Sequence, residues 1–230
     1  MIILALDTTT RSGSAAVVRD GVVHVVRAGD SDLSYGQRLP AELTLVLAEA
    51  GVRIDEIDLF AVAAGPGSFT GLRVGIATIQ GLAMAHGKRV VAVSALDALA
   101  RAAANASHPI AAWMDAQREE VFAALYSSDG ITEIVPPVSA APATVLETWA
   151  AISARPDLIF IGDGAVKHRT LLEREVGERT LIVDPPPLAG LIGQIAADDP
   201  ARATLPHAIV PIYVRKSDAE LARARRAAGR

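Results

Sequence analysis

The part of this chain best suited to chemistry is a glycine-rich segment, residues 65–75, between a predicted strand and a predicted helix. Backbone N–H groups and the helix dipole at such a junction can hold an anion. Its spacing, G-x-G-x-x-x-G, is one residue too long for a dinucleotide-binding turn, and no Gly-Lys-Ser/Thr ends it as in a P-loop. The segment is therefore either a phosphate cradle or a tight structural turn. Ser68 and Thr70 have no histidine near them in the sequence, so Thr70 is predicted to cap the helix rather than act as a nucleophile.

Two further segments could complete a nucleotide site. Asp7 ends the first predicted strand and is followed by Thr8 and Thr9. An aspartate there can hold a hydrated Mg²⁺ with hydroxyls near a phosphate, or it can simply bond to the backbone of its own turn. Gly162 and Gly164 flank an aspartate between a strand and a helix, where they could support a nucleotide base or only connect the two elements. The candidate nucleotide site is therefore Asp7, Thr8, Thr9, Gly162 and Gly164.

Several other classes of site are excluded by composition. The 230 residues include no cysteine, which removes disulfides, thiolate nucleophiles and iron–sulfur clusters. No pair of the five histidines has the spacing of a helical metal site, so we expect no metal centre. A net charge of −4 does not favour nucleic-acid binding through overall charge. The chain begins with neither a basic leader nor a membrane-length apolar run, and we expect a soluble, cytoplasmic protein.

The elements that must position these residues follow from the apolar pattern. Continuous apolar runs and Asp-Gly pairs predict strands and hairpins, and apolar residues at helical spacing predict the helices. The predicted strands are 2–6, 14–19, 22–27, 59–64, 90–94, 158–161 and 181–183. The predicted helices are 39–50, with Pro40 in its first turn, and 70–85, 95–104, 144–152, 165–175 and 188–197.

A weak internal repeat suggests the overall architecture. An apolar strand ending in Asp7 is followed by an Asp-Gly pair 13 residues later, and one ending in Asp115 by another pair 14 residues later. Two copies of a three-stranded meander with added βα units predict a duplicated α/β fold. We expect subdomains at residues 1–106 and 107–215, each with a mixed sheet and flanking helices, followed by a basic tail at 216–230.

The helix after the glycine segment also predicts a contact. Gly71 and Gly75 lie four residues apart beside an apolar stripe, and glycine costs a helix about 1 kcal/mol relative to alanine. Close approach of a neighbouring element would explain the cost, either inside the domain or at a subunit interface. A second stripe lies on the helix at 39–50. The candidate interface is Leu39, Leu43, Leu47, Leu72, Gly75, Ile76, Ile79 and Ala83.

Taken together, these segments resemble the bacterial TsaB (YeaZ) family over nearly the whole chain. The glycine segment at 65–75 carries most of the resemblance. The other matching segments are 5–8, 80–83, 115–122, 162–164 and the P-x-Y-x-R motif at 211–215. The chain departs from the family at Tyr35-Gly36-Gln37, where a histidine followed by Ser or Thr is common. The resemblance implies a duplicated actin-like (ASKHA, RNase H-like) fold and a role in adding a threonylcarbamoyl group to an adenosine of the tRNA anticodon loop.

The resemblance also implies partners. The catalytic relative TsaD has a similar glycine segment, then a strand and a pair of metal-binding histidines, whereas the matching residues 93–99 contain no histidine here. The chain is thus expected to be a non-catalytic subunit without a cofactor, apart from weak or vestigial ATP or ADP binding. It is expected to bind TsaD and TsaE, to reach tRNA only through that complex, and to pair weakly with itself. Two alternatives are an actin-like kinase or ATPase using Asp7 and, much less favoured, a metallopeptidase.

Overall fold

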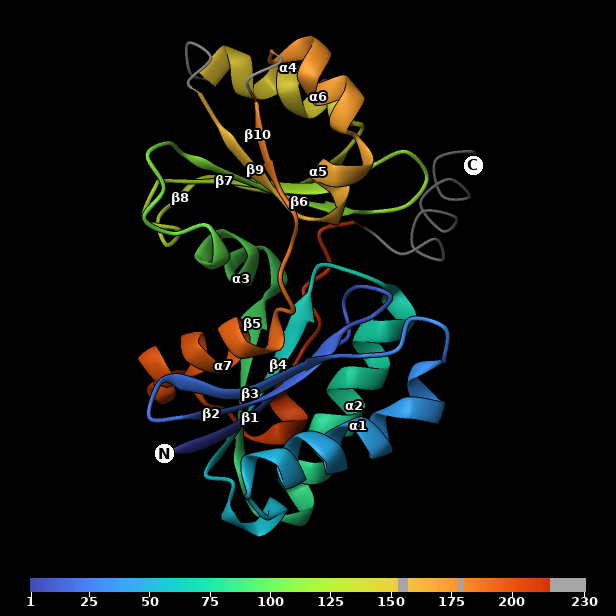
Figure 1. Cartoon of the computed structure of the whole chain (residues 1–230), viewed down its shortest axis with the longest axis vertical. Helices are drawn as coiled ribbons and strands as arrows, with labels where there is room; N and C mark the ends of the chain where they lie inside the picture. Colours follow the sequence, from blue (N-terminus) through green and yellow to red (C-terminus); the bar gives the residue numbers. More distant parts are fainter. Residues whose placement is uncertain (153–156, 178–179, 216–230) are drawn as a thin grey trace, which may run out of the picture.

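The computed structural model describes residues 1–152, 157–177 and 180–215 and contains two five-stranded sheets, one in each half of the chain (Figure 1). The first sheet has the order β3-β2-β1-β4-β5, and the second has the order β10-β9-β6-β7-β8. The strands of the first sheet are β1 (Ile2–Asp7), β2 (Ser14–Arg19), β3 (Val22–Ala28), β4 (Leu59–Gly65) and β5 (Arg89–Ser94). Those of the second are β6 (Ile110–Asp115), β7 (Val121–Tyr126), β8 (Glu133–Ala140), β9 (Ile159–Ile161) and β10 (Leu181–Val183).

The two sheets repeat one pattern. In the first, β1 pairs antiparallel with β2 and parallel with β4. In the second, β6 pairs antiparallel with β7 and parallel with β9. Read from its other end, the second order is β8-β7-β6-β9-β10, which matches the first strand for strand. The duplicated α/β fold predicted from the sequence repeat is therefore confirmed.

Both faces of the first sheet are covered, and β1 is accordingly buried from Ile3 to Asp7. Helices α1 (Tyr35–Ala50) and α2 (Phe69–Ala85) pack on one face, against Leu4 and Leu6. Helices α3 (Ala95–Ala102) and α7 (Ala189–Asp198) pack on the other, against Ile3 and Ala5. A strand buried on both faces needs a continuous apolar run, which the sequence of β1 supplies.

Helix α3 also packs on the inner face of the second sheet, against β6 and β7. Helices α4 (Pro142–Ile152), α5 (Asp163–Lys167) and α6 (Arg169–Glu175) lie over its outer face (Figure 1). There Trp113 meets Trp149 and Phe160 edge-on at 6.1 and 5.3 Å between ring centroids. On the inner face a single apolar cluster runs from Ile3 through α3 to Met114 and Tyr126. The two halves are thus joined through a common core.

The last described segment corrects the predicted subdomain boundary. Although α7 falls within the predicted subdomain 107–215, it packs against β1, β2 and β4 of the first sheet. After it, η2 (Pro200–Arg202) and η3 (Pro206–Ala208) continue along the first half, where Val90 and Thr204 form an isolated bridge. Another short helix, η1 (Ile54–Glu56), precedes β4. Residues 188–209 therefore complete the first half, and the predicted tail at 216–230 lies outside the described residues.

The helix termini also differ from the predicted ones. Helix α1 begins at Tyr35, capped by Ser34, so Pro40 lies inside the helix rather than in its first turn. Helix α2 begins at Phe69, and the Ser68 side chain accepts a hydrogen bond from Gly71 N. Ser68, rather than Thr70, is thus the N-cap. The helix predicted at 165–175 is two helices, α5 and α6, which meet at His168.

Candidate functional site

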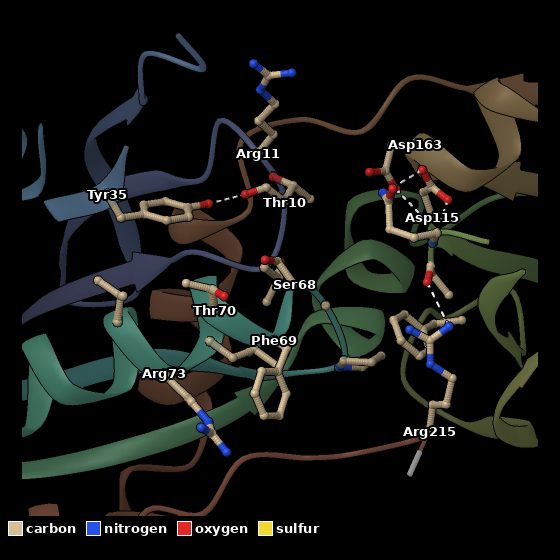
Figure 2. Close-up of a pocket in the computed structure, with 18 of the residues that line it drawn as sticks. Thr10, Arg11, Tyr35, Ser68, Phe69, Thr70, Arg73, Asp115, Asp163 and Arg215 are labelled. Carbon is tan, nitrogen blue, oxygen red and sulfur yellow. Dashed lines mark hydrogen bonds between the residues drawn. The ribbon is translucent and has the colours of Figure 1, made fainter. Parts of the chain in front are cut away.

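A cleft with a volume of about 1280 Å³ lies between the two halves. One wall consists of the β1–β2 turn and the beginnings of α1 and α2, including Tyr35 and Phe69. The other consists of the β6–β7 turn from Asp115 and the start of α5 at Asp163, and residues 212–215 border the cleft. Figure 2 shows these two walls facing each other, with Arg73 beside Phe69 and Arg215 beneath Asp115. The cleft therefore lies between equivalent turns of the repeated halves.

Asp7 sits at the end of β1 and is almost fully buried. Its Oδ1 accepts hydrogen bonds from Thr9 N at 2.8 Å and from Thr9 Oγ1 at 2.6 Å. Burial raises the pKa of Asp7 despite these two bonds, and the charge of Asp163 raises it further. One oxygen of the carboxylate is thus hydrogen-bonded within its own turn, the arrangement of the second of the two interpretations that the sequence allowed.

The glycines of the 65–75 segment allow α2 to lie directly on the β1–β2 turn. A Cβ atom on Gly71 would overlap the carbonyl oxygen of Thr8, and one on Gly75 would overlap the Thr8 hydroxyl. Ser68 N donates to Thr9 O at 2.8 Å, which ties the loop to the same turn. The Thr8 hydroxyl is buried and has no hydrogen-bond partner among the described residues. Close packing within the chain accounts for these glycines without a phosphate.

The second half repeats this arrangement. A Cβ atom on Gly162 would overlap the carbonyl oxygen of Trp113, and one on Gly164 would press on the backbone of Met114 and Asp115. Asp163 Oδ1 accepts from Asp115 N at 3.0 Å, and burial raises the pKa of Asp163. Gly162 and Gly164 are therefore packed against the end of β6, just as the first glycines are packed against the turn after β1.

These residues fit a magnesium nucleotide poorly. Asp7 and Asp163 lie close enough that the negative charge of Asp163 raises the pKa of Asp7. No lysine lines the cleft in the described part of the chain, and the nearby Lys167 Nζ is paired with Asp115 Oδ1 at 3.1 Å. Within residues 1–152, 157–177 and 180–215, no three His, Cys, Asp or Glu side chains are grouped to hold a metal ion. The cations that line the cleft are Arg11, Arg73, Arg118 and Arg215, and none of them belongs to a phosphate-binding fingerprint.

The turn between β6 and β7 has an unusual backbone. Gln117, Arg118 and Glu119 have φ values of 60°, 55° and 59°, in the left-handed region that non-glycine residues rarely occupy. Each such residue destabilises the folded state by about 1–3 kcal/mol, and it keeps this conformation only because the surrounding contacts hold it there. The turn is closed by Ala116 N, which donates to Glu120 O at 3.0 Å, and by Gln117 N, which donates to Asp115 Oδ1 at 2.9 Å. The turn contains neither glycine nor asparagine, the residues that most often adopt this conformation, so the sequence did not indicate it.

Two residues that the sequence analysis missed hold the opposite turn. The Tyr35 hydroxyl donates a hydrogen bond to Thr10 O (Figure 2). Arg38 Nη2 donates to Arg11 O at 3.1 Å. Arg38 is buried at 3% exposure and also pairs with Glu42. Burial raises the pKa of Tyr35 to about 12, so its hydroxyl remains a donor over the usual pH range. The departure at Tyr35-Gly36-Gln37 thus coincides with a contact from α1 to the cleft.

The predicted interface residues lie in the core instead of on the surface. Leu39, Leu43, Leu72, Gly75, Ile76, Ile79 and Ala83 are buried, and Leu47 is half-buried. Most of these side chains pack against β1, β2 and β4, so the apolar stripes face their own sheet. The exposed sides of the two helices carry different residues: Ala41, Leu45, Ala48, Ala77, Gly81 and Met84. A partner that contacts α1 and α2 must meet this second set.

Comparison with known proteins shows which family the chain resembles in sequence and in structure. Residues 33–223 match the family described as TsaD, tRNA N6-adenosine threonylcarbamoyltransferase. The tRNA threonylcarbamoyladenosine biosynthesis protein TsaB of Bacillus subtilis is 26% identical over 234 residues, covering 96% of each chain. The structure of YeaZ from Pseudomonas aeruginosa is 29% identical and has a TM-score of 0.74, covering 92% of this chain and 99% of that one.

A more distant structure shares only the fold. The activator of the 2-hydroxyisocaproyl-CoA dehydratase from Clostridium difficile, with bound ADPNP, has a TM-score of 0.51 at 11% identity. The match covers 86% of this chain and 95% of that one. None of the helices in the described residues has both the length and the apolar character needed to cross a bilayer.

Proposed function

Because this chain belongs to the TsaB (YeaZ) family of tRNA threonylcarbamoyladenosine biosynthesis proteins, we propose that it is a non-catalytic subunit that binds and activates a TsaD-type transferase. That partner, with TsaE, would place the threonylcarbamoyl group on N6 of an adenosine in the tRNA anticodon loop. The chain would reach tRNA only as part of this complex.

The main support for a non-catalytic role is that the residues after β5 make structural contacts within the chain. Ser94 caps α3, and Asp97 Oδ1 accepts a hydrogen bond of 2.7 Å from the hydroxyl of the buried Tyr126. Burial and the Asp97 carboxylate raise the pKa of Tyr126, so the hydroxyl stays protonated as the donor. In TsaD, the resemblance implies metal-binding histidines in this stretch. Here the same stretch holds α3 to β7, and no ligand set is available.

The exposed face of α1 and α2 is the contact surface we propose for the partner. We place Gly81 at its centre, because it is exposed and a Cβ atom there would have no neighbour within 4 Å. Packing inside the chain therefore does not explain this glycine, although it costs the helix about 1 kcal/mol relative to alanine. With Ala77 and Ala48 also exposed, a partner helix could approach closely. Pairing of the same face with a second copy would compete with TsaD for it.

A bulky substitution on this face tests the proposal. We expect Gly81→Arg to weaken TsaD binding at least about 100-fold, since a central clash typically removes several kcal/mol. Titration calorimetry with purified TsaD measures the change. Ala150→Arg, at an exposed position of α4 in the other half, is the control and should bind normally. A folded Gly81→Arg protein with unchanged affinity would mean that TsaD binds elsewhere.

We further infer that any nucleotide binding is weak. Because neither glycine segment has a phosphate-binding lysine or a full fingerprint, and both pack against the chain itself, the isolated protein should bind ATP with a Kd above about 0.1 mM, or roughly −5.5 kcal/mol. Calorimetry with Mg-ATP gives this value directly. Micromolar binding, or phosphate release that is lost in Asp7→Ala, would instead support the kinase or ATPase alternative.

A further inference from the structure

The P-x-Y-x-R motif at 211–215 crosses from one half of the molecule to the other, and the proposed function leaves it unused. In Figure 1 this segment, coloured red, runs between the two halves. Its first anchor is on the first half, where Ile212 N donates to Ala64 O at 2.7 Å. Next to it, the Tyr213 ring lies 5.8 Å from that of Phe69, the first residue of α2. The segment is thus fixed to the end of β4 and the start of α2.

The second anchor is on the other half and depends on one side chain. Arg215 Nη1 donates to Ala116 O at 3.0 Å and pairs with Glu120 Oε2 at 3.2 Å. The guanidinium also lies over the Phe122 ring, 5.9 Å from its centroid. Glu120 is itself held by Ser139 Oγ at 2.9 Å. These contacts fasten the segment to the left-handed turn after β6 and to the strand that follows it.

The position of these anchors gives them a mechanical role. On one side the halves are joined through α3 by a shared apolar cluster, and elsewhere the cleft separates them. Two bodies joined in this way are expected to rotate about the joined side. The segment borders the cleft, and Val214 within it packs against the shared cluster, so the segment bridges the halves where the cleft meets that joint. We propose that residues 212–215 form a latch that holds the two walls of the cleft at one separation, with Arg215 as the positioning residue.

The chemistry of the latch makes it separable from the fold. Arg215 and Glu120 are about one-third exposed, at 30% and 36%, and neither belongs to the apolar clusters. Replacing Arg215 therefore removes the hydrogen bond to Ala116 O and the ion pair with Glu120 without emptying a core. The consequence should be a change in the separation of the halves while each half stays folded.

Distance measurement between the halves tests the latch. Because the chain contains no cysteine, spin labels can be attached at Leu33→Cys, at the mouth of the cleft, and at Thr170→Cys on α6, both exposed. Pulsed electron paramagnetic resonance then gives the distribution of distances. We expect one narrow distribution for the labelled parent and a broader one, shifted to longer distance, for Arg215→Ala. Circular dichroism establishes that both are folded.

Arg89→Ala is the matched control for this experiment. Arg89 Nη1 donates to Ala203 O at 2.9 Å, so its loss also removes a bond to a backbone carbonyl, but within the first half. Its distance distribution should match that of the parent. Identical distributions for Arg215→Ala and the parent, or equal broadening by Arg89→Ala, would overturn the proposal. If Arg215→Ala fails to fold, Arg215→Met, which keeps an unbranched side chain but can neither donate to Ala116 O nor pair with Glu120, is measured with the same expectation.

Discussion

At the scale of single residues, Asp7 shows how burial changes the meaning of a carboxylate. The folded chain removes Asp7 from water and surrounds it with its own turn, so its pKa is raised above the usual value. A raised pKa means that the folded state keeps the proton to a higher pH than the unfolded state does. The free energy of unfolding contributed by this group is therefore greatest below pH 3.8 and falls as the pH rises through the raised pKa.

This gives a prediction for Asp7→Asn. The amide oxygen can still accept from Thr9 N and Thr9 Oγ1, while the buried charge and its repulsion with Asp163 disappear. We expect the variant to unfold at higher urea concentration than the parent at pH 7. The difference should shrink as the pH approaches 4. Urea unfolding at pH 4, 5, 6 and 7 measures it.

Asp55→Asn provides a control of opposite sign. The exposed Asp55 pairs with Arg53, which lowers its pKa, so its contribution is present at neutral pH and lost on acidification. Its removal should destabilise slightly at pH 7 and have no effect at low pH. An Asp7→Asn protein less stable than the parent at pH 7 would show that the charge is needed where it lies.

The sequence was more informative about residue types in this region than about their partners. It grouped Asp7, Thr8, Thr9, Gly162 and Gly164 as one candidate site. In the structure Thr9 lines the cleft, and Gly162 and Gly164 pack against the end of β6. The sequence did not indicate Tyr35 or Arg38, because their contacts to Thr10 and Arg11 span about 25 residues of chain. Such contacts depend on how the helix lies over the turn, which periodicity does not specify.

At the scale of elements, α2 contains glycines with opposite roles, and this can be measured. Gly71 faces the Thr8 carbonyl, whereas Gly81 faces open space. We expect Gly71→Ala to destabilise the protein by about 1–3 kcal/mol through the clash. Gly81→Ala should instead stabilise it by about 0.5–1 kcal/mol, because alanine is the better helix former.

Thermal or urea unfolding of the two variants separates these expectations. Each carries the same added methyl group in the same helix, so each serves as the control for the other. Destabilisation by Gly81→Ala would reveal an internal contact at that position and would remove the reason for proposing a partner there.

The positions of elements were predictable where the apolar pattern was simple. The strand at 181–183 was predicted with its observed bounds, and 2–6 and 59–64 each fell one residue short. The division at His168 was not predictable, because residues 165–175 keep helical character on both sides of it. The stripe from Leu72 to Ala83 illustrates a further limit. Spacing identifies an apolar face, but a face that meets its own sheet and one that meets a partner have the same pattern.

At the scale of the whole molecule, the proposed role predicts dependence on partners. The purified protein alone should transfer no threonylcarbamoyl group to tRNA, because the described residues include no group of side chains that could hold a metal ion and the sequence has no cysteine. Transfer should appear when TsaD and TsaE are added. Mass spectrometry of digested tRNA detects the modified adenosine. Omitting TsaD is the control, and modification without it would contradict the proposal.

The whole-molecule arrangement was predictable as a duplication but not as a pair of separate units. The two Asp-Gly repeats correctly indicated equivalent meanders, since hairpin turns have local signals. The return of α7 to the first sheet has no such signal. Its partners on β1 and β2 lie about 175 residues away, as in the bond from Ala189 N to Ser14 Oγ.

This return has a consequence for the order in which the molecule can be made. The last strand of the first sheet ends at Ser94, and the helix that covers one face of that sheet begins only at Ala189. Translation at roughly 5–20 residues per second leaves an interval of about 5–20 seconds between them. Throughout it, Ile3, Ala5 and Val18 lack their α7 neighbours, and the growing chain presents an apolar sheet to its surroundings. The N-terminal half can thus complete its core only after most of the second half has left the ribosome.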